Sequence, residues 1–413
     1  MARHLRLCFY AFALAQLISI FGDRLNQFSV VGMVGKLEPG SSVELLKLSL
    51  FMHVPILLFA PLFGALLDRW SRAWVLIIVD LLRGIIVALI PSLFYLVGNL
   101  YAFYGPVMLL SLANLLFSPA KSAIIPEIVP EKQLFQVNAA LWGFGIVATI
   151  AGFIMGGWLF DYRSWEWTFY CDAASYLASV LLLLPLLMLP FAPRPAPAQK
   201  TVPMGWGNKM LSGIREFAFS IKDGAVLIKE SRVIALNLIA QTFIFSLAGW
   251  LYVIGIAHLQ EVFPPGRTIF LSIAGAAGTV GLLGGSIAAS VFRERLAYNR
   301  TISVGALLMG VSLIGLAKTE TPISLAIWCA LMGASVSPAI ILTETLLQKH
   351  IPLEFRGRVF SAREALTKMA FLGFSIAAAV ADAFFDKGPI LIALGLFLAL
   401  FGVVLERSKW ARV

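Results

Sequence analysis

Charged residues are scarce in this chain. Only 13% of its 413 residues are Asp, Glu, Lys or Arg, and 60% are hydrophobic, whereas soluble domains carry about 25% charged residues. A soluble protein of this length cannot enclose so much apolar surface, because single cores stop growing at about 250–300 residues. The composition therefore excludes a soluble protein and predicts that the lipid bilayer surrounds most of the chain.

Chemically reactive residues are also few. The three cysteines, Cys8, Cys171 and Cys329, lie far apart in apolar runs, which excludes a disulfide framework or a cysteine metal site. Gly32–Leu37 is the nearest approach to a phosphate-binding loop, but it has the wrong spacing and lacks the hydroxyl. No nucleophile–base pair or cofactor motif is present. We therefore expect a protein that is not an enzyme and uses no cofactor or metal.

What the sequence has in abundance is long apolar runs. A membrane span needs about 20 apolar residues, and twelve runs meet this length. The first is too long for the apolar region of a signal peptide, so we interpret it as a span. The twelve are residues 7–34, 47–67, 74–97, 101–125, 136–160, 167–191, 233–259, 268–292, 301–317, 322–346, 359–381 and 389–405.

A polar segment separates the sixth run from the seventh. It spans residues 192–232, opens with four prolines and carries seven basic residues. We predict a linker with an amphipathic helix near Met210–Ile228. The chain then divides into an N-terminal six-helix bundle (1–191), the cytoplasmic linker (192–232) and a C-terminal six-helix bundle (233–413).

The basic residues are distributed unevenly between the two sides. The termini and the connections on the side of the linker carry 23 Lys and Arg residues, and the other connections carry six. Cytoplasmic loops are enriched in Lys and Arg, so both termini and the linker are predicted to be cytoplasmic, in a multi-pass protein of the bacterial inner membrane. This topology accounts for the net charge of +10 without a nucleic-acid partner.

A short repeat relates the two halves. Ser118-Pro119-Ala120 occurs in the last third of the fourth run, and Ser337-Pro338-Ala339 occurs in the tenth, 219 positions later. Both copies lead to the same predicted side, which indicates a parallel repeat with its axis along the membrane normal. Chance similarity between short proline-containing turns is the alternative.

Two motifs resemble those of the major facilitator superfamily. The segment 64–72, GALLDRWSR, is similar to the loop motif G-x-L-x-D-R-x-G-R, with Ser71 in place of its second glycine. The segment 152–159, GFIMGGWL, resembles the antiporter motif G-P-x-x-G-G-x-L, with Phe153 in place of proline. The basic motif usual in the fourth helix of proton-coupled drug antiporters is missing, because no Arg occurs between Tyr101 and Pro119.

Within the superfamily the chain resembles a bacterial exporter branch that includes macrolide and enterobactin exporters. The resemblance lies in 117–139, with its FSPAK and IPE segments, and in 356–360, RGRVF. Phe21-Gly22-Asp23, together with Ser118–Lys121, is also similar to lysophospholipid transporters. The resemblance implies an all-α fold of twelve transmembrane helices in two pseudo-symmetric six-helix bundles around a central cavity.

The resemblance also implies a cytoplasmic gate. Asp68 is expected to lie at the start of the eleventh span, where a carboxylate satisfies free N–H groups and the positive end of the helix dipole. A structural loop clamp is the alternative. The residues assigned to the gate are Gly64, Asp68, Arg69, Arg72, Asp80, Arg83, Glu127, Gly152, Gly156, Gly157, Arg356 and Arg358.

Ionisable residues inside a span are costly, so each suggests a function. Asp23 lies beyond the middle of the first span and shares a helix face with Asn26. It can serve as a proton-coupling group or form a static ion pair with Arg24 or Arg83. The further coupling and cavity candidates are His53, Asn114, Asn138, Asp172, Asn237, Gln241, Glu344, Glu364 and Lys368.

Structural alternatives accompany several of these candidates. Asp172 near the outer end of the sixth span is typical of helix packing or capping, and His53 of a structural histidine. Glu364 and Lys368 are spaced i,i+4, so they can simply neutralise each other.

Three functions fit the sequence. The first is export of a small amphiphilic molecule by alternating access, with a proton or another ion as coupling partner and the chain acting as a monomer. The second is lysophospholipid transport. The third is a receptor or scaffold with a transporter fold that moves nothing, which the intact Gly64–Arg72 motif and Asp23 argue against, since a scaffold needs no gate.

Overall fold

The computed structural model describes residues 3–67, 70–188, 232–292, 297–351 and 356–407. These residues are helical almost throughout, and twelve of their helices are long and apolar enough to cross a membrane. Helices are the expected solution in lipid, because a helix satisfies its backbone hydrogen bonds within one segment. The prediction of an all-α membrane protein with twelve spans is confirmed.

The first half of the sequence forms six spans. In chain order they are α1 (Arg3–Leu37), α2 (Ser42–Leu67), α3 (Arg72–Val97), α4 (Tyr101–Ile128), α5 (Leu134–Tyr162) and α6 (Trp165–Leu183), with the 3-10 turns η1 (Glu131–Gln133) before α5 and η2 (Leu184–Met188) after α6.

The second half forms the other six. They are α8 (Arg232–Trp250), which continues through the π-helical turn η3 (Leu251–Gly255) into α9 (Ile256–Val262), then α10 (Ile269–Val291), α11 (Tyr298–Ala317), α12 (Pro322–His350), α13 (Arg356–Asp382) and α14 (Lys387–Arg407).

The contacts group the chain into two compact units. Unit 1 comprises Met1–Gln27, Phe51–Gly152 and Ser164–Phe219. Unit 2 comprises Phe28–Leu50, Phe153–Arg163 and Ser220–Val413. Parts of α1, α2 and α5 thus pack with the second half of the sequence. The division into bundles 1–191 and 233–413 stays a prediction, and the linker with its amphipathic helix lies almost wholly outside the described residues.

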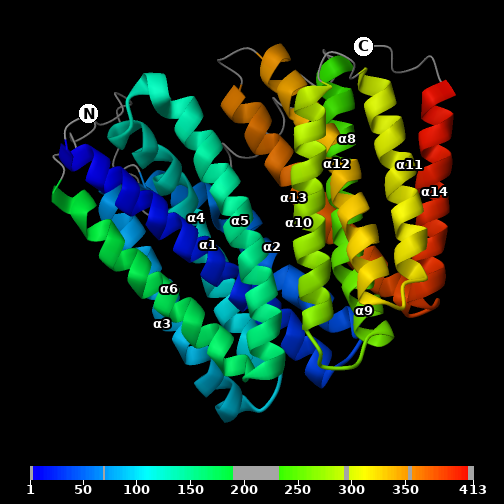
Figure 1. The fold of residues 1–413 in the computed structure, drawn as a ribbon, viewed down its shortest axis with the longest axis horizontal. Coiled ribbons are helices and arrows are strands. Elements are labelled where there is room, and N and C mark those ends of the chain that lie inside the picture. Colours follow the sequence, from blue (N-terminus) through cyan, green and yellow to red (C-terminus); the bar gives the residue numbers. More distant parts are fainter. Residues whose placement is uncertain (1–2, 68–69, 189–231, 293–296, 352–355, 408–413) are drawn as a thin grey trace. The chain divides into compact units, whose positions relative to one another are not determined.

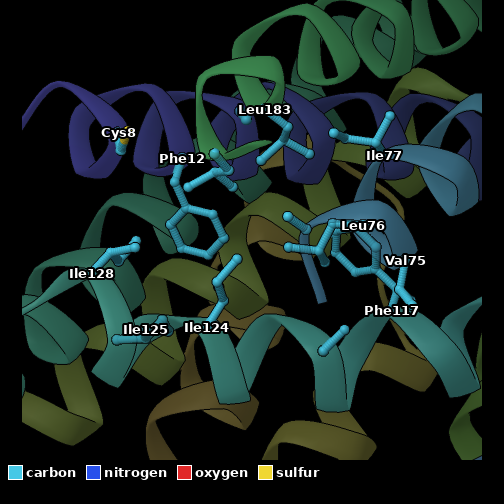
Figure 2. Close-up of a cluster of buried hydrophobic side chains, with 14 of the residues drawn as sticks. Cys8, Phe12, Val75, Leu76, Ile77, Phe117, Ile124, Ile125, Ile128 and Leu183 are labelled. Carbon is cyan, nitrogen blue, oxygen red and sulfur yellow. The ribbon is translucent and has the colours of Figure 1, made fainter. Parts of the chain in front are cut away.

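Unit 1 is held together by an apolar core between α1, α3, α4 and the end of α6. Phe12, Leu76 and Ile124 are completely buried there, and Figure 2 shows the Phe12 ring among side chains from several helices. On α1 the core residues Cys8, Phe12 and Ala15 follow the i, i+4, i+7 spacing of one helix face.

Unit 2 brings α10 and α12 into backbone contact. A Cβ added at Gly281 would lie 1.9 Å from the carbonyl oxygen of Ala330, and one at Gly333 would lie 2.1 Å from that of Gly278. Small residues let membrane helices approach this closely. Figure 1 shows α10 and α12 running alongside each other. Gly281 of α10 and Gly333 of α12 are therefore packing positions, whereas nothing lies within 4 Å of a Cβ at Gly284.

Candidate functional site

A buried polar cluster lies in unit 1 where α3 packs against α4 and α6. Asp80 and Arg83 of α3 are almost completely inaccessible to solvent, at 0% and 2% exposure, and form an ion pair of 3.3 Å. Such a pair is costly to bury unless hydrogen bonds satisfy its remaining groups. The neighbouring helices supply them.

Each end of the ion pair has further partners. The Ser179 hydroxyl of α6 donates to Asp80 Oδ2 at 2.6 Å, and Arg83 donates to the Asn114 side chain of α4. The guanidinium of Arg83 also lies 4.1 Å from the centre of the Phe117 ring, a cation–π distance. Side chains of two neighbouring helices, α4 and α6, therefore hold the pair in place.

Asp23 joins this region from α1. It is half-buried and accepts a hydrogen bond from the Tyr176 hydroxyl of α6. Arg24 donates to Gln27 on its own helix, and Arg83 pairs with Asp80. Within the described part of the chain, no ion pair includes Asp23. The geometry thus gives no support to a static pair between Asp23 and Arg24 or Arg83.

Asp172 lies on α6, four residues before Tyr176, the partner of Asp23. It is completely buried and interacts with Ser175 and with Asn26 of α1. As the eighth residue of α6 it does not cap the helix. The helices touch here, since a Cβ at Gly22 would lie 2.4 Å from Asp172 Oδ1 and 2.0 Å from Ser175 Oγ.

Sequence reasoning missed Ser175, Tyr176 and Ser179. A signal for them exists: with Asp172 they fall at i, i+3, i+4 and i+7, which is one face of a helix. Reading the polar residues of α6 as a stripe would have found them.

A second polar site lies in unit 2, where the end of α5 meets the start of α10. Asp161 Oδ1 accepts hydrogen bonds from the backbone N–H of Thr268, at 2.8 Å, and from its hydroxyl, at 2.9 Å. Asp161 Oδ2 accepts the N–H of Ile269 at 3.0 Å. The carboxylate therefore caps a helix from another segment, where it also meets the positive end of the helix dipole.

The surrounding contacts are tight. A Cβ at Gly157 would lie 2.3 Å from Ser272 Oγ, and one at Gly32 would lie 2.2 Å from Thr268 Cγ2. Gln260 of α9 links the same region to α1, donating to the Val31 carbonyl at 3.1 Å and accepting from the Gly40 N–H at 3.3 Å. We call Asp161, Thr268 and Ile269 the α5–α10 cap. No local sequence pattern predicts this cap, because 107 positions separate Asp161 from Thr268.

The residues assigned to the cytoplasmic gate separate in the structure. Arg72 forms an ion pair with Glu127 and donates to the Ala123 carbonyl at 3.1 Å, which joins α3 to α4. Asp80 and Arg83 do not join this pair, because eight residues of helix set Asp80 about 12 Å beyond Arg72. Gly152 packs against α1, where a Cβ would lie 2.7 Å from the Phe21 carbonyl oxygen.

The other residues assigned to the gate are two buried glycines and five residues at or near the borders of the described ranges. Gly156 and Gly157 are buried on α5. Asp68 and Arg69 lie outside the described residues, and the side-chain surroundings of Gly64, Arg356 and Arg358 are likewise outside the description.

The remaining coupling candidates are dispersed. Gln241 of α8 is buried and donates to Thr343 at 3.2 Å and to Glu344 at 3.3 Å, both on α12. Glu344 also pairs with Arg363 of α13. Glu364 and Lys368 form the expected i,i+4 pair at 3.0 Å. The structure places Asn237 in the interior, His53 at a half-buried position and Asn138 at an exposed one.

Comparison with known proteins decides the family. The model of the Major Facilitator Superfamily matches residues 12–378. The chain belongs to the major facilitator superfamily. Two solved structures share its fold: a bacterial homologue of the iron transporter ferroportin in the inward-facing state (TM-score 0.70, 15% identity, 97% of this chain and 99% of that one), and the nucleoside transporter NupG (TM-score 0.67, 16% identity, 99% and 100%).

Curated relatives agree with this family assignment. The chain is 26% identical to the uncharacterized MFS-type transporter YfiS of Bacillus subtilis, over 96% of this chain and 93% of that protein. It is 23% identical to macrolide efflux protein A of Streptococcus pyogenes, over 91% and 90%. The match to the lysophospholipid transporter LplT of Pectobacterium carotovorum, at 29% identity, covers 41% and 39%. The chain is thus a multi-pass membrane transporter of the superfamily with efflux-type relatives.

Proposed function

We propose that this superfamily member is a proton-coupled exporter of a small amphiphilic molecule that works by alternating access in the bacterial inner membrane. The observation that carries the proposal is the acid-rich cluster of unit 1, with Asp23 half-buried beside completely buried Asp172. The sequence has no nucleotide-binding loop, so an ion gradient is the available energy source. We further propose that the chain acts as a monomer without enzymatic activity.

The substrate class is inferred from relatives. The match to macrolide efflux protein A extends over nine-tenths of both chains, whereas the match to LplT covers less than half of each. Macrolide-like amphiphiles are therefore the first substrates to test, and lysophospholipid transport is the second candidate. A receptor or scaffold without flux remains the proposal of another class.

Orientation and gating complete the proposal. Both termini and the 192–232 linker are cytoplasmic by the distribution of basic residues. Asp68, with Arg69, Arg356 and Arg358, closes the cytoplasmic side, helped by the Arg72–Glu127 pair. The α5–α10 cap then lies on the opposite side, because α5 starts from the cytoplasmic connection and Asp161 is near its far end.

The decisive experiment measures flux in proteoliposomes. Wild-type protein should accumulate a radiolabelled macrolide only when a pH gradient is imposed. Asp23→Asn should abolish gradient-driven accumulation while retaining downhill exchange, because only the neutral form of the group remains. Asp386→Asn, at an exposed aspartate, is the matched control and should transport normally.

Three outcomes separate the candidates. Accumulation by Asp23→Asn against the macrolide gradient rules Asp23 out as the coupling residue. Movement of a fluorescent lysophospholipid, with no movement of the macrolide, favours the second candidate. If neither probe moves under any gradient although both bind, the receptor hypothesis replaces transport.

A further inference from the structure

The polar cluster of unit 1 contains more acid than base. Three carboxylates face it: Asp23 of α1, Asp80 of α3 and Asp172 of α6. Two cations face it, Arg83 of α3 and Lys121 of α4, and the phenol of Tyr176 lies among them. With every group in its usual form at neutral pH, the cluster would carry an excess negative charge inside the membrane-spanning part.

Among the described residues, neither cation forms an ion pair with Asp172. Arg83 is committed to Asp80, Asn114 and Phe117. Lys121 is half-buried and forms no ion pair among the described residues. Asp172 is 0% exposed, and its Oδ2 atom has no hydrogen-bond partner within the described part of the protein. An uncompensated carboxylate in such a place costs several kcal/mol, whereas a carboxylic acid does not.

The described part of the second half contains an equivalent helix pair that packs without buried charge. Adding the repeat spacing of 219 to the residue numbers of α6 gives a range that largely overlaps α14, and α11 packs with α14 as α3 packs with α6. Position 391, which is 219 after Asp172, is Leu391, completely buried in an apolar cluster. Glycines provide the closeness instead: a Cβ at Gly310 would lie 2.4 Å from the Gly395 carbonyl oxygen.

We propose that Asp172 is a proton-binding residue that shares one proton with Asp23 across the α1–α6 contact at Gly22. Asp23 is half-buried and so is open to water, and Asp172 holds the proton when that access closes. In the transfer, the O–H bond of Asp23 breaks and that of Asp172 forms, so the pair keeps a single negative charge. Its role in transport rests on the proposed function, but proton binding can be measured without flux.

The test is infrared spectroscopy of the purified protein in lipid nanodiscs, titrated with base. Wild type should show a protonated-carboxyl band that disappears as pH rises. Asp172→Asn should lack this band, and exposed Asp386→Asn should keep it. An Asp172→Asn spectrum identical to that of wild type overturns the proposal.

A second variant keeps the test decisive if Asp172→Asn does not fold. Asp23→Asn removes a neighbouring negative charge, so Asp172 should release its proton more readily and the band should disappear at lower pH. An unchanged pH dependence overturns the sharing of a proton. Absence of pH-driven flux in wild type with the band assigned to Asp172 would reject the proposed function and leave the proton site standing.

Discussion

At the scale of single residues, Arg83 is the residue of the unit 1 cluster whose burial depends on the most partners. This side chain is 2% exposed, pairs with Asp80, donates to Asn114 and covers the Phe117 ring. Water cannot solvate its positive charge at this exposure, so the stability of the cluster depends on all of these partners. Replacing one member changes the energetics of the others.

We predict that Arg83→Gln lowers stability far more than the double variant Asp80→Asn/Arg83→Gln. The single change leaves the Asp80 carboxylate buried and unpaired, at a cost of about 3–5 kcal/mol. The double change leaves two neutral groups that can still hydrogen-bond. Thermal unfolding in detergent measures both. Equal losses in the two variants would mean that the ion pair is unimportant for stability.

A second residue-scale prediction concerns Gly22. A Cβ here would lie 2.0 Å from Ser175 Oγ and 2.4 Å from Asp172 Oδ1, so Gly22→Ala should force α1 and α6 apart and cost about 1–3 kcal/mol by overpacking. Gly105→Ala is the control, because nothing lies within 4 Å of its added Cβ. Similar melting temperatures for the two variants would contradict the close α1–α6 contact.

At the scale of elements, the α5–α10 cap joins two helices through one carboxylate. Helix N-termini leave N–H groups without partners, and Asp161 satisfies two of them together with the Thr268 hydroxyl. Without the cap, the N–H groups of Thr268 and Ile269 are either exposed to solvent or left without a hydrogen-bond acceptor. The strength of the cap therefore bears directly on how readily α5 and α10 separate.

We predict that Asp161→Ala weakens this contact by about 0.5–2 kcal/mol, the usual range for a helix cap. Amide hydrogen exchange should accelerate at the start of α10 while α12 stays protected. Asp161→Asn should be intermediate, because it keeps one acceptor oxygen and loses the charge. Unchanged exchange at Thr268 and Ile269 in the alanine variant would show that the cap contributes little.

The glycines of α10 allow an internally matched comparison. Gly281→Ala should destabilise the protein, because its Cβ would lie 1.9 Å from the Ala330 carbonyl oxygen, whereas Gly284→Ala meets nothing within 4 Å. Alanine also favours helix over glycine by roughly 1 kcal/mol, so Gly284→Ala should be neutral or stabilising. Differential scanning fluorimetry should separate the two variants, and the reverse order would contradict the α10–α12 packing.

At the scale of the whole molecule, orientation follows from charge. We predict that an alkaline phosphatase fusion at Lys209 is inactive and that a green fluorescent fusion there is bright, since the 192–232 linker should remain in the cytoplasm. A fusion at Lys318, in the α11–α12 connection, should give the opposite result. An active phosphatase at Lys209 would reverse every assignment of a side.

The positions of the helices could be predicted from the sequence, but the side-chain contacts between different helices could not. The spans 74–97 and 301–317 agree with α3 and α11 within three residues, because apolar length and flanking polar residues are local properties. Pairings such as Asp161 with Thr268 depend on how distant helices meet. Asp23 and Asp172 could be singled out as costly charges, but their partners Tyr176 and Asn26 could not be assigned.

The backbone contact between α10 and α12 also bears on how the chain is made. The ribosome must complete α11 before α12 can appear, which at about 5–20 residues per second takes on the order of a few seconds. During that interval the glycine face of α10, including Gly281 and Gly285, lacks its final neighbour. We therefore expect α10 to remain near the translocon, or under an insertase, until α12 emerges, and a longer α11–α12 connection to extend that wait.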